Sequence, residues 1–278
     1  MRILYPLAKR FIAGHDFDSA KPTIQKLMED GYEVSIDYLG ELSKTYEDCE
    51  RARDQYFKII NYYKDKNIDV SIKPTQLGLL INRDKCLELV LSVAEKAYKN
   101  KHTIRLDMED SRVTEETVEL AISINEYFPN IGIALQANLH RTILDVSLFT
   151  SAGIPVRLVK GAYKEKESIA FQKKKEIEEE FYSRVEELYL EEAKNPAIAT
   201  HDEVLLEKIM KSVMSRCFDY EFLYGIRRDL QKNLKKRGYR VRIYVPFGTD
   251  WWPYTLRRLK EWKNLKFVAK NIIKEWIS

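Results

Sequence analysis

The apolar positions along the chain change period repeatedly, from two residues to about 3.6 and back. Short runs with a period of two, rich in branched and aromatic residues, are typical of strands, and the longer period predicts amphipathic helices. The predicted strands cover residues 34–39, 70–73, 104–107, 131–136, 156–160, 197–200, 218–223 and 241–245. The predicted helices between them cover residues 46–64, 83–99, 114–127, 139–150, 173–193, 203–215 and 226–237.

Three more helices complete the pattern. One covers residues 19–29 with Asp18 or Ser19 as its cap, and two follow the last strand at residues 251–262 and 263–276. Eight strand-then-helix units in 278 residues favour a (βα)8 barrel over an open sheet. No Gly-x-Gly-x-x-Gly motif follows a strand, which argues against a dinucleotide-binding sheet. We therefore expect one α/β domain over residues 1–278, a TIM-like barrel with an N-terminal and a C-terminal helix.

Composition and charge narrow the class of protein. The net charge of +4, from 47 basic and 43 acidic residues, is too small to predict a nucleic-acid partner. Three widely spaced cysteines fit a reducing compartment, and no run resembles a signal peptide or a membrane span. A cytoplasmic location is expected, with peripheral contact at the inner face of the membrane left open. The four histidines lack metal-ligand spacing, so no metal site is expected.

Polar residues recur where the predicted strands end. They are Asp37, Lys73, Asp107, Gln136, Lys160, Thr200 with His201, Tyr224 and Tyr244. In a barrel these ends open onto one rim, which is where catalytic groups lie. Lys73 and Asp107 are expected to neutralise each other and to present an ammonium group to an anionic substrate. The alternative is a structural ion pair that closes the barrel.

The segment 155–163 places two cations in an otherwise apolar strand. Arg157 and Lys160 face opposite ways on a regular strand, and buried cations need anionic or electron-rich partners. Gly161 and Ala162 allow a flat or phosphate-bearing ligand to approach the backbone. These residues predict an anionic cofactor, with a purely structural role as the alternative.

Residues 240–261 combine a strand, a turn at 246–248 and a helix with two adjacent arginines. On that helix Tyr254, Arg257, Arg258 and Glu261 share one face, and paired guanidinium groups suit a carboxylate or a phosphate. An outer helix of a barrel hardly needs such residues, so we expect this helix to lie over the rim and residues 263–276 to take the outer position. A solvated charged face is the alternative. The apolar stripe of residues 263–276 predicts packing on the barrel or contact with a membrane.

Nine motifs together resemble the proline dehydrogenase family, over nearly the whole chain from Arg10 to Glu261. They are SIDYLGE at 35–41, SIKPTQLG at 71–78, IRLDMED at 104–110, ALQA at 134–137, RLVKGAY at 157–163, ATHD at 199–202, LYGIRRDLQ at 223–231, YVPFG at 244–248 and YTLRRLKE at 254–261. The resemblance implies a distorted (βα)8 barrel that binds FAD without a covalent bond. It also implies oxidation of L-proline to 1-pyrroline-5-carboxylate, with hydride transfer from proline C5 to flavin N5 and electrons passed to a quinone.

The resemblance also implies roles for individual residues. Lys73, Arg257 and Arg258 are expected to bind the carboxylate of proline, Asp107 to support Lys73, and Tyr244, Tyr254 and Leu223 to surround the ring. Arg157 is expected beside the flavin nitrogen, and the remaining cofactor residues are Met108, Gln136, Lys160, Gly161, Ala162, Tyr163, Thr200 and His201. Glu41 is expected to act as a gate by pairing with an arginine of the rim helix, which Glu261 helps to position.

Two other functions remain open on the residues alone. A lysine at a strand end, Lys73 or Lys160, is also the nucleophile of a Schiff-base aldolase, and a barrel can serve as a binding scaffold without turnover. No general base is evident in the motifs, so solvent could accept the amine proton. No segment resembles an aldehyde dehydrogenase, so the product is expected to pass to a separate pyrroline-5-carboxylate dehydrogenase.

Overall fold

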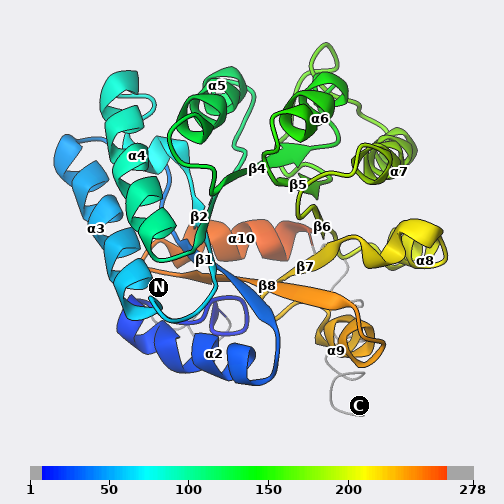
Figure 1. The fold of residues 1–278 in the computed structure, drawn as a ribbon, viewed down its shortest axis with the longest axis horizontal. Helices are drawn as coiled ribbons and strands as arrows, with labels where there is room; N and C mark the ends of the chain where they lie inside the picture. The colour runs from blue at the N-terminus through cyan, green and yellow to red at the C-terminus, as the bar shows by residue number, and fades with distance from the viewer. Residues whose placement is uncertain (1–7, 262–278) are drawn as a thin grey trace. The chain divides into compact units, whose positions relative to one another are not determined.

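The computed structural model describes residues 8–261, with side chains described as far as Arg258. Its eight strands follow chain order around a closed barrel, and every strand pair with a described register is parallel. Figure 1 shows strands and helices alternating along the chain, from α2 and β1 in blue to β8 and α10 in orange. The predicted α/β barrel is confirmed. The helix predicted at residues 263–276 lies outside the described residues.

The observed elements lie within a few residues of the predicted ones. The strands are β1 Glu33–Tyr38, β2 Asp69–Ile72, β3 Thr103–Leu106, β4 Ile131–Gln136, β5 Val156–Val159, β6 Ala197–Ala199, β7 Asp219–Leu223 and β8 Arg240–Phe247. The α-helices are α2 Phe17–Glu29, α3 Tyr46–Tyr62, α4 Arg83–Lys99, α5 Thr114–Asn125, α6 Thr142–Ser151, α7 Lys174–Leu190, α8 Glu203–Met210, α9 Arg228–Lys236 and α10 Trp251–Glu261. Two short 3-10 helices, η2 Pro74–Leu77 and η3 Val213–Arg216, follow β2 and α8.

The chain forms two compact units. One consists of residues 41–220, and the other combines residues from both ends of the chain, 8–40 and 221–261 in its described part. In the 41–220 unit, β2 to β6 form a continuous parallel sheet. Branched apolar residues fill its strands, with Val70, Ile104, Ile133 and Leu158 fully buried, as expected for a parallel sheet that helices cover.

A buried ion pair joins the amino-terminal ends of this sheet. Arg105 of β3 donates from Nη2 and Nε to Asp69 Oδ2 of β2, at 3.0 and 3.3 Å. Its Nη1 also donates to the carbonyl oxygen of Pro155, just before β5, at 3.4 Å. Gly132 makes room for this guanidinium, because a Cβ there would lie 2.9 Å from the Pro155 oxygen and 3.3 Å from Nη1. These contacts connect β2, β3 and the start of β5 at the amino-terminal end of the sheet.

The other unit is built on the pairing of β1 with β8. The register runs from Glu33 with Arg242 to Tyr38 with Phe247. An apolar cluster within this unit consists of Ala8, Phe11, Ile12, Leu39, Ile226 and Tyr254, with Leu223 and Trp251 packed against it. Residues that are far apart in the chain therefore share one small core.

Three local predictions were wrong. Helix α2 begins at Phe17 and is capped by Asp16 rather than Asp18 or Ser19, because Asp16 Oδ1 accepts from the Ser19 N–H and Ser19 Oγ accepts from the Asp16 N–H. Strand β8 continues through Pro246 and Phe247, so the turn comes only at Gly248, which has φ +137°. The helix predicted at 203–215 stops at Met210, where Ser212 Oγ donates to the Ile209 carbonyl oxygen and α8 gives way to η3.

Candidate active site

Side chains from β2 and β5, and from the residues that directly follow β2 and β3, meet in the interior of the 41–220 unit. Arg157 of β5 donates from Nη1 to Asp107 Oδ1 at 2.6 Å and from Nη2 to Ser71 Oγ of β2 at 3.0 Å. The ammonium group of Lys73 lies 3.6 Å from the other carboxylate oxygen, Asp107 Oδ2. All three charged residues are buried, with exposed fractions of 3% for Arg157, 9% for Asp107 and 7% for Lys73. One carboxylate therefore holds two cations in place.

The strand register explains this convergence. The Asp107 N–H donates to the carbonyl oxygen of Ile72 at 2.9 Å, which places Asp107 beside Lys73. Ser71 of β2 and Lys73, the extended residue that follows the strand, are two positions apart and therefore point to the same face. The predicted pairing of Lys73 with Asp107 is thus present. Ser71 was missed as a site residue, although its spacing from Lys73 was the available signal.

Gln136 at the end of β4 connects two loops. Its Nε2 donates to the Glu109 carbonyl oxygen at 2.9 Å, and its Oε1 accepts from the Ala162 N–H at 3.3 Å. Gly161 has φ +109°, and a Cβ there would lie 1.9 Å from Asn138 Oδ1, so the turn requires glycine. Gly161 and Ala162 are exposed, which leaves the backbone of this turn accessible to a ligand.

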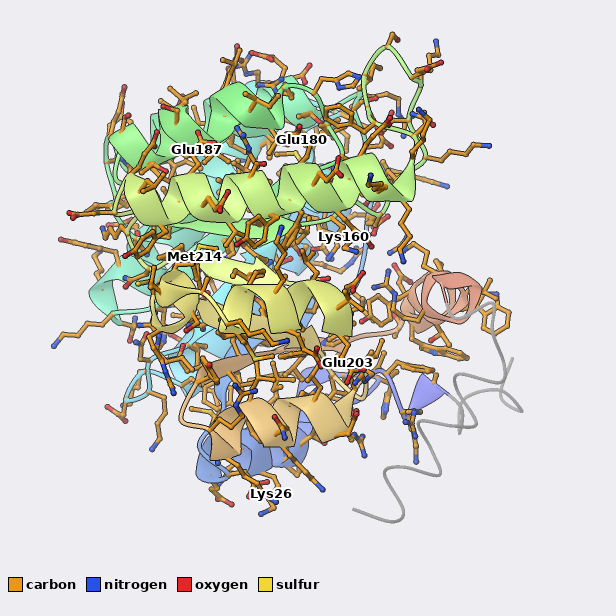
Figure 2. All side chains as sticks on the ribbon, turned by 90° about the vertical axis from the view of Figure 1, so that its right-hand side faces the viewer. Lys26, Lys160, Glu180, Glu187, Glu203 and Met214 are labelled. Carbon is orange, nitrogen blue, oxygen red and sulfur yellow. The ribbon has the colours of Figure 1, made fainter. Side chains whose placement is uncertain are left out.

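Lys160 binds two carboxylates on the helical side of the sheet. Its ammonium group lies 2.6 Å from Asp202 Oδ2 and 3.0 Å from Glu178 Oε1 of α7. Figure 2 labels Lys160 on the side of the molecule where α7 and α8 lie. Asp202 also caps α8 by accepting from the Leu205 N–H. Burial acts to raise the pKa of Asp202, but the hydrogen bonds from Lys160 and its neighbours outweigh burial and lower the pKa to about 2. Arg157 and Lys160 thus face different surroundings, as their spacing predicted.

The other predicted cofactor residues lie near the ends of β3, β5 and β6. Met108 and Thr200 are buried, whereas Tyr163 and His201 are half-buried. Thr200 Oγ1 accepts from the Asp202 N–H at 3.2 Å, which joins it to the carboxylate that binds Lys160. Their assignment to a cofactor stays a prediction.

The unit formed by the chain ends holds the remaining predicted substrate residues. In α10, the guanidinium carbon of Arg258 lies 5.2 Å from the centre of the Tyr254 ring, and both residues are buried. Arg257 is half-buried. Tyr244 is buried in β8, where its carbonyl oxygen accepts from the Tyr224 N–H at 2.9 Å, and Leu223 packs on the apolar cluster. The side chain of Glu261 lies outside the described part of the chain.

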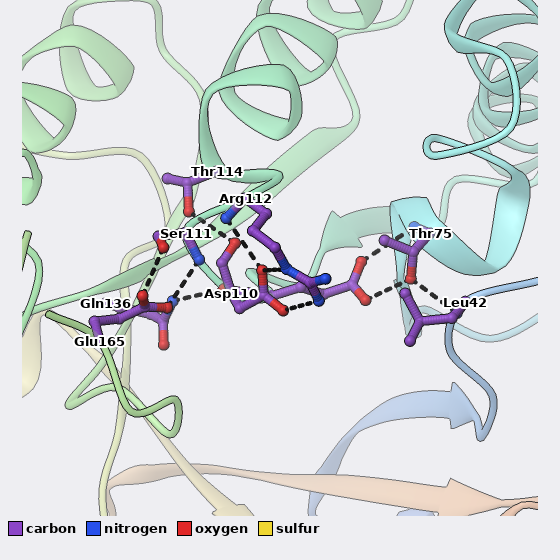
Figure 3. A network of polar contacts seen from close by, with 9 residues as sticks. Leu42, Thr75, Asp110, Ser111, Arg112, Thr114, Gln136 and Glu165 are labelled. Atoms are coloured by element: carbon purple, nitrogen blue, oxygen red, sulfur yellow. Dashed lines mark hydrogen bonds and ion pairs between the residues drawn. The ribbon is translucent and has the colours of Figure 1, made fainter.

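A polar network surrounds the loop after β3, and sequence reasoning missed two of its members. Glu109 accepts hydrogen bonds from Thr75, and Thr75 in turn accepts one from Leu42, beside the predicted gate residue Glu41 (Figure 3). In the same loop Ser111 donates to Glu165. Thr75 and Glu109 belong to the SIKPTQLG and IRLDMED motifs, but nothing in the sequence shows that they contact each other.

Two further properties concern the described residues as a whole. Among residues 8–261, no three His, Cys, Asp or Glu side chains gather in a way that could hold a metal ion. No helix within that range is long and apolar enough to cross a membrane.

The sequence of the chain is similar to those of known proteins. The sequence model of the family described as proline dehydrogenase matches residues 20–270. The chain is 34% identical to proline dehydrogenase 2 of Bacillus subtilis over 276 residues, covering 96% of this chain and 91% of the relative. It is 33% identical to the proline dehydrogenase of Deinococcus radiodurans over 284 residues, covering 98% and 91% of the two chains.

Solved structures support the fold. Proline utilization A from Bdellovibrio bacteriovorus, inactivated by N-propargylglycine, superposes with a TM-score of 0.84 at 22% identity over 94% of this chain. A mutant of the Bradyrhizobium japonicum protein of the same name gives 0.79 at 21% identity over 97% of this chain. The chain spans only 33% and 32% of those longer proteins. Its sequence relatives match along almost their whole length, and on that match the chain belongs to the proline dehydrogenase family of enzymes.

Proposed function

We propose that this enzyme oxidises L-proline to 1-pyrroline-5-carboxylate with FAD as its cofactor. Family membership supports proline oxidation. The observation that supports the finer proposal is the buried cluster in which Asp107 holds Arg157 and Lys73 at 2.6 and 3.6 Å. Fixed cations of this kind are suited to an anionic substrate and an electron-accepting cofactor.

Lys73, Arg257 and Arg258 are the proposed ligands of the substrate carboxylate. Proline is small, so most of its affinity has to come from charge-assisted hydrogen bonds to that carboxylate. The stacking of Arg258 on Tyr254 holds the guanidinium group in one orientation, which lowers the entropy lost on binding. Tyr244, Tyr254 and Leu223 are proposed to pack against the ring of the substrate.

The residues around the Gly161 turn fit a large flat cofactor. The turn exposes backbone without a bulky side chain, and Gln136 beneath it supplies a buried amide. Met108, Gln136, Arg157, Lys160, Gly161, Ala162, Tyr163, Thr200 and His201 are the proposed FAD residues. Bound FAD would supply the two-electron chemistry by accepting at N5 the hydride that leaves proline C5.

Arg157 is proposed to hold a fixed positive charge beside the cofactor. Its two hydrogen bonds, to Asp107 and Ser71, prevent the guanidinium from turning, so little reorganisation is needed during the reaction. The substrate has to react as a neutral amine, and we propose that solvent accepts the amine proton.

The electrons are proposed to pass to a quinone, with peripheral contact at the inner face of the membrane for a cytoplasmic enzyme. The product is proposed to go to a separate pyrroline-5-carboxylate dehydrogenase. We also propose that residues 1–278 act as a single domain and that Glu41 gates access to the substrate.

An absorbance spectrum of the purified protein tests the proposal directly. A yellow protein whose flavin band disappears when L-proline is added without oxygen is the expected result. The D-enantiomer serves as a matched control and should leave the band unchanged. A colourless protein that borohydride traps on a carbonyl substrate would instead support an aldolase and overturn the proposal.

A further inference from the structure

The carboxylate of Glu109 is buried in a position that the proposed chemistry does not use. Its exposed fraction is 4%, and it lies two residues beyond Asp107 in the loop after β3. Oε1 accepts from Thr75 Oγ1 at 2.5 Å, and Oε2 accepts from the Thr75 N–H at 3.1 Å. A buried carboxylate is costly unless such donors compensate it, so both oxygens are engaged with one residue of η2.

Thr75, which Glu109 holds in place, also binds the loop between β1 and α3. Its Oγ1 accepts from the Leu42 N–H at 3.1 Å, and its carbonyl oxygen accepts from the Ser43 N–H at 3.2 Å. Ser43 Oγ also donates to the Gln76 carbonyl oxygen at 2.7 Å. Because the Thr75 hydroxyl accepts from the Leu42 N–H, its own proton donates to Glu109, and this gives the chain of hydrogen bonds a fixed direction (Figure 3).

The loop needs this support because its backbone is strained. Leu42 has φ +57°, in the left-handed region that branched side chains rarely adopt, and its side chain is exposed. A non-glycine residue stays in this conformation only where surrounding contacts hold it. The Leu42 N–H is held by Thr75 Oγ1, and Glu41, the proposed gate residue, comes immediately before Leu42 in the chain.

We propose that Glu109 and Thr75 are positioning residues that hold the 41–43 segment, and with it Glu41, in the conformation that binds proline. Glu109 is also joined to the proposed cofactor turn, because its carbonyl oxygen accepts from Gln136, which accepts from Ala162. One residue thus links the gate segment to the turn that faces the cofactor. The effect on proline binding rests on the proposed function, whereas the effect on the segment does not.

Hydrogen exchange in the unliganded protein tests the effect on the segment. Thr75→Val removes the hydroxyl at nearly constant volume, and Glu109→Gln replaces one of the two oxygens that accept from Thr75 by an amide donor with little change of shape. Both should make the amides of Leu42 and Ser43 exchange about tenfold faster, the factor that one lost hydrogen bond produces. Trypsin should also cut faster after the exposed Lys44. Thr75→Ser, which keeps the hydroxyl, should restore the protection.

Ser111→Ala provides a matched control, because it removes a 2.5 Å hydrogen bond to Glu165 in the same loop without touching Thr75. It should leave exchange at Leu42 and Ser43 unchanged. Wild-type exchange at these amides in folded Thr75→Val overturns the positioning role. If Glu109→Gln does not fold, comparing the exchange rates of Thr75→Val and Thr75→Ser still tests the positioning role.

Steady-state kinetics then test the link to proline. Thr75→Val should raise the KM for proline about tenfold with FAD content unchanged and kcat altered less, while Thr75→Ser behaves as wild type. Faster exchange with an unchanged KM would overturn the link to proline binding. An inactive wild-type protein would overturn the proposed function instead, and the exchange experiment would still decide whether the segment is held.

Discussion

At the scale of single residues, the central feature is a carboxylate shared by two cations. Asp107 contacts Arg157 at 2.6 Å and Lys73 at 3.6 Å, in surroundings that contain little solvent. Removing one member of a buried charged group leaves the others without compensation, which costs more than the loss of an exposed ion pair. Changes at these three residues are therefore expected to affect stability as well as the proposed chemistry.

Arg157→Ala should lower both the FAD content and the free energy of unfolding. The expected loss of stability is about 3 kcal/mol, because Asp107 and Ser71 lose a buried partner. Urea unfolding and the ratio of flavin to protein absorbance measure the two effects. Arg83→Ala, which removes an exposed ion pair with Glu119, serves as the control and should cost less than about 1 kcal/mol. Wild-type FAD content in Arg157→Ala would remove Arg157 from the cofactor site.

Arg258→Met should raise the KM for proline while FAD stays bound. The loss of the proposed charge-assisted hydrogen bond to the substrate carboxylate corresponds to at least about a tenfold change in KM. The methionine keeps contact with the Tyr254 ring, so the fold of α10 should persist. Arg53→Met is the matched control, because that arginine also lies over an aromatic ring, 5.6 Å from the centre of Phe57. Equal KM values for the two variants would argue against a carboxylate at Arg258.

At the scale of elements, the hydrophobic pattern predicted where helices and strands lie but not where each of them begins or ends. The period of the pattern predicted every strand, because apolar residues recur in each strand even where a buried polar residue such as Arg105 or Arg157 interrupts them. It did not predict that Asp16 caps α2 or that Ser212 ends α8, because both depend on one side-chain hydrogen bond. The pairing of Lys73 with Asp107 was predictable because both follow strand ends. The pairing of Thr75 with Glu109 was not, because Thr75 lies in a short 3-10 helix and Glu109 in a loop, where no periodic pattern indicates which side chains meet.

The start of α8 should be sensitive to acid. The pKa of Asp202 falls from 3.8 to about 2 on folding, so its ionised form contributes stability above pH 3.8 that is lost as the pH drops towards 2. Asp202→Asn keeps an acceptor for the Leu205 N–H but removes the charge that binds Lys160. The free energy of unfolding of Asp202→Asn should fall furthest below that of the wild type near neutral pH, and the difference should shrink as the pH drops from 3.8 towards 2.

Urea unfolding at a series of pH values measures this deficit. Asp18→Asn is the control, because the ion pair of Asp18 with Lys21 is exposed at the carboxylate and should contribute little at any pH. A deficit for Asp202→Asn that does not change with pH would show that the charge of Asp202 is not stabilised by folding.

At the scale of the whole molecule, the proposed single domain can be tested with the protein's own fluorescence. All four tryptophans lie outside residues 41–220, and Trp251 and Trp252 belong to the described part of the unit formed by the chain ends. Tryptophan fluorescence therefore reports on that unit, whereas far-ultraviolet circular dichroism reports on helices of both. If the chain is one cooperative domain, the two signals should change at the same urea concentration. A fluorescence change at lower urea would mean that the unit unfolds on its own.

The pairing of β1 with β8 has a consequence for how the protein is made. Glu33 and Arg242, which face each other across these strands, are 209 residues apart in the sequence. At about 5–20 residues per second, a ribosome needs roughly 10–40 seconds to travel that distance. During this time the first strand has been synthesised but its β8 partner has not, and its open edge could pair with other nascent chains. Chaperones that shield emerging polypeptides should therefore improve the yield of this protein more by acting on its first forty residues than on its middle.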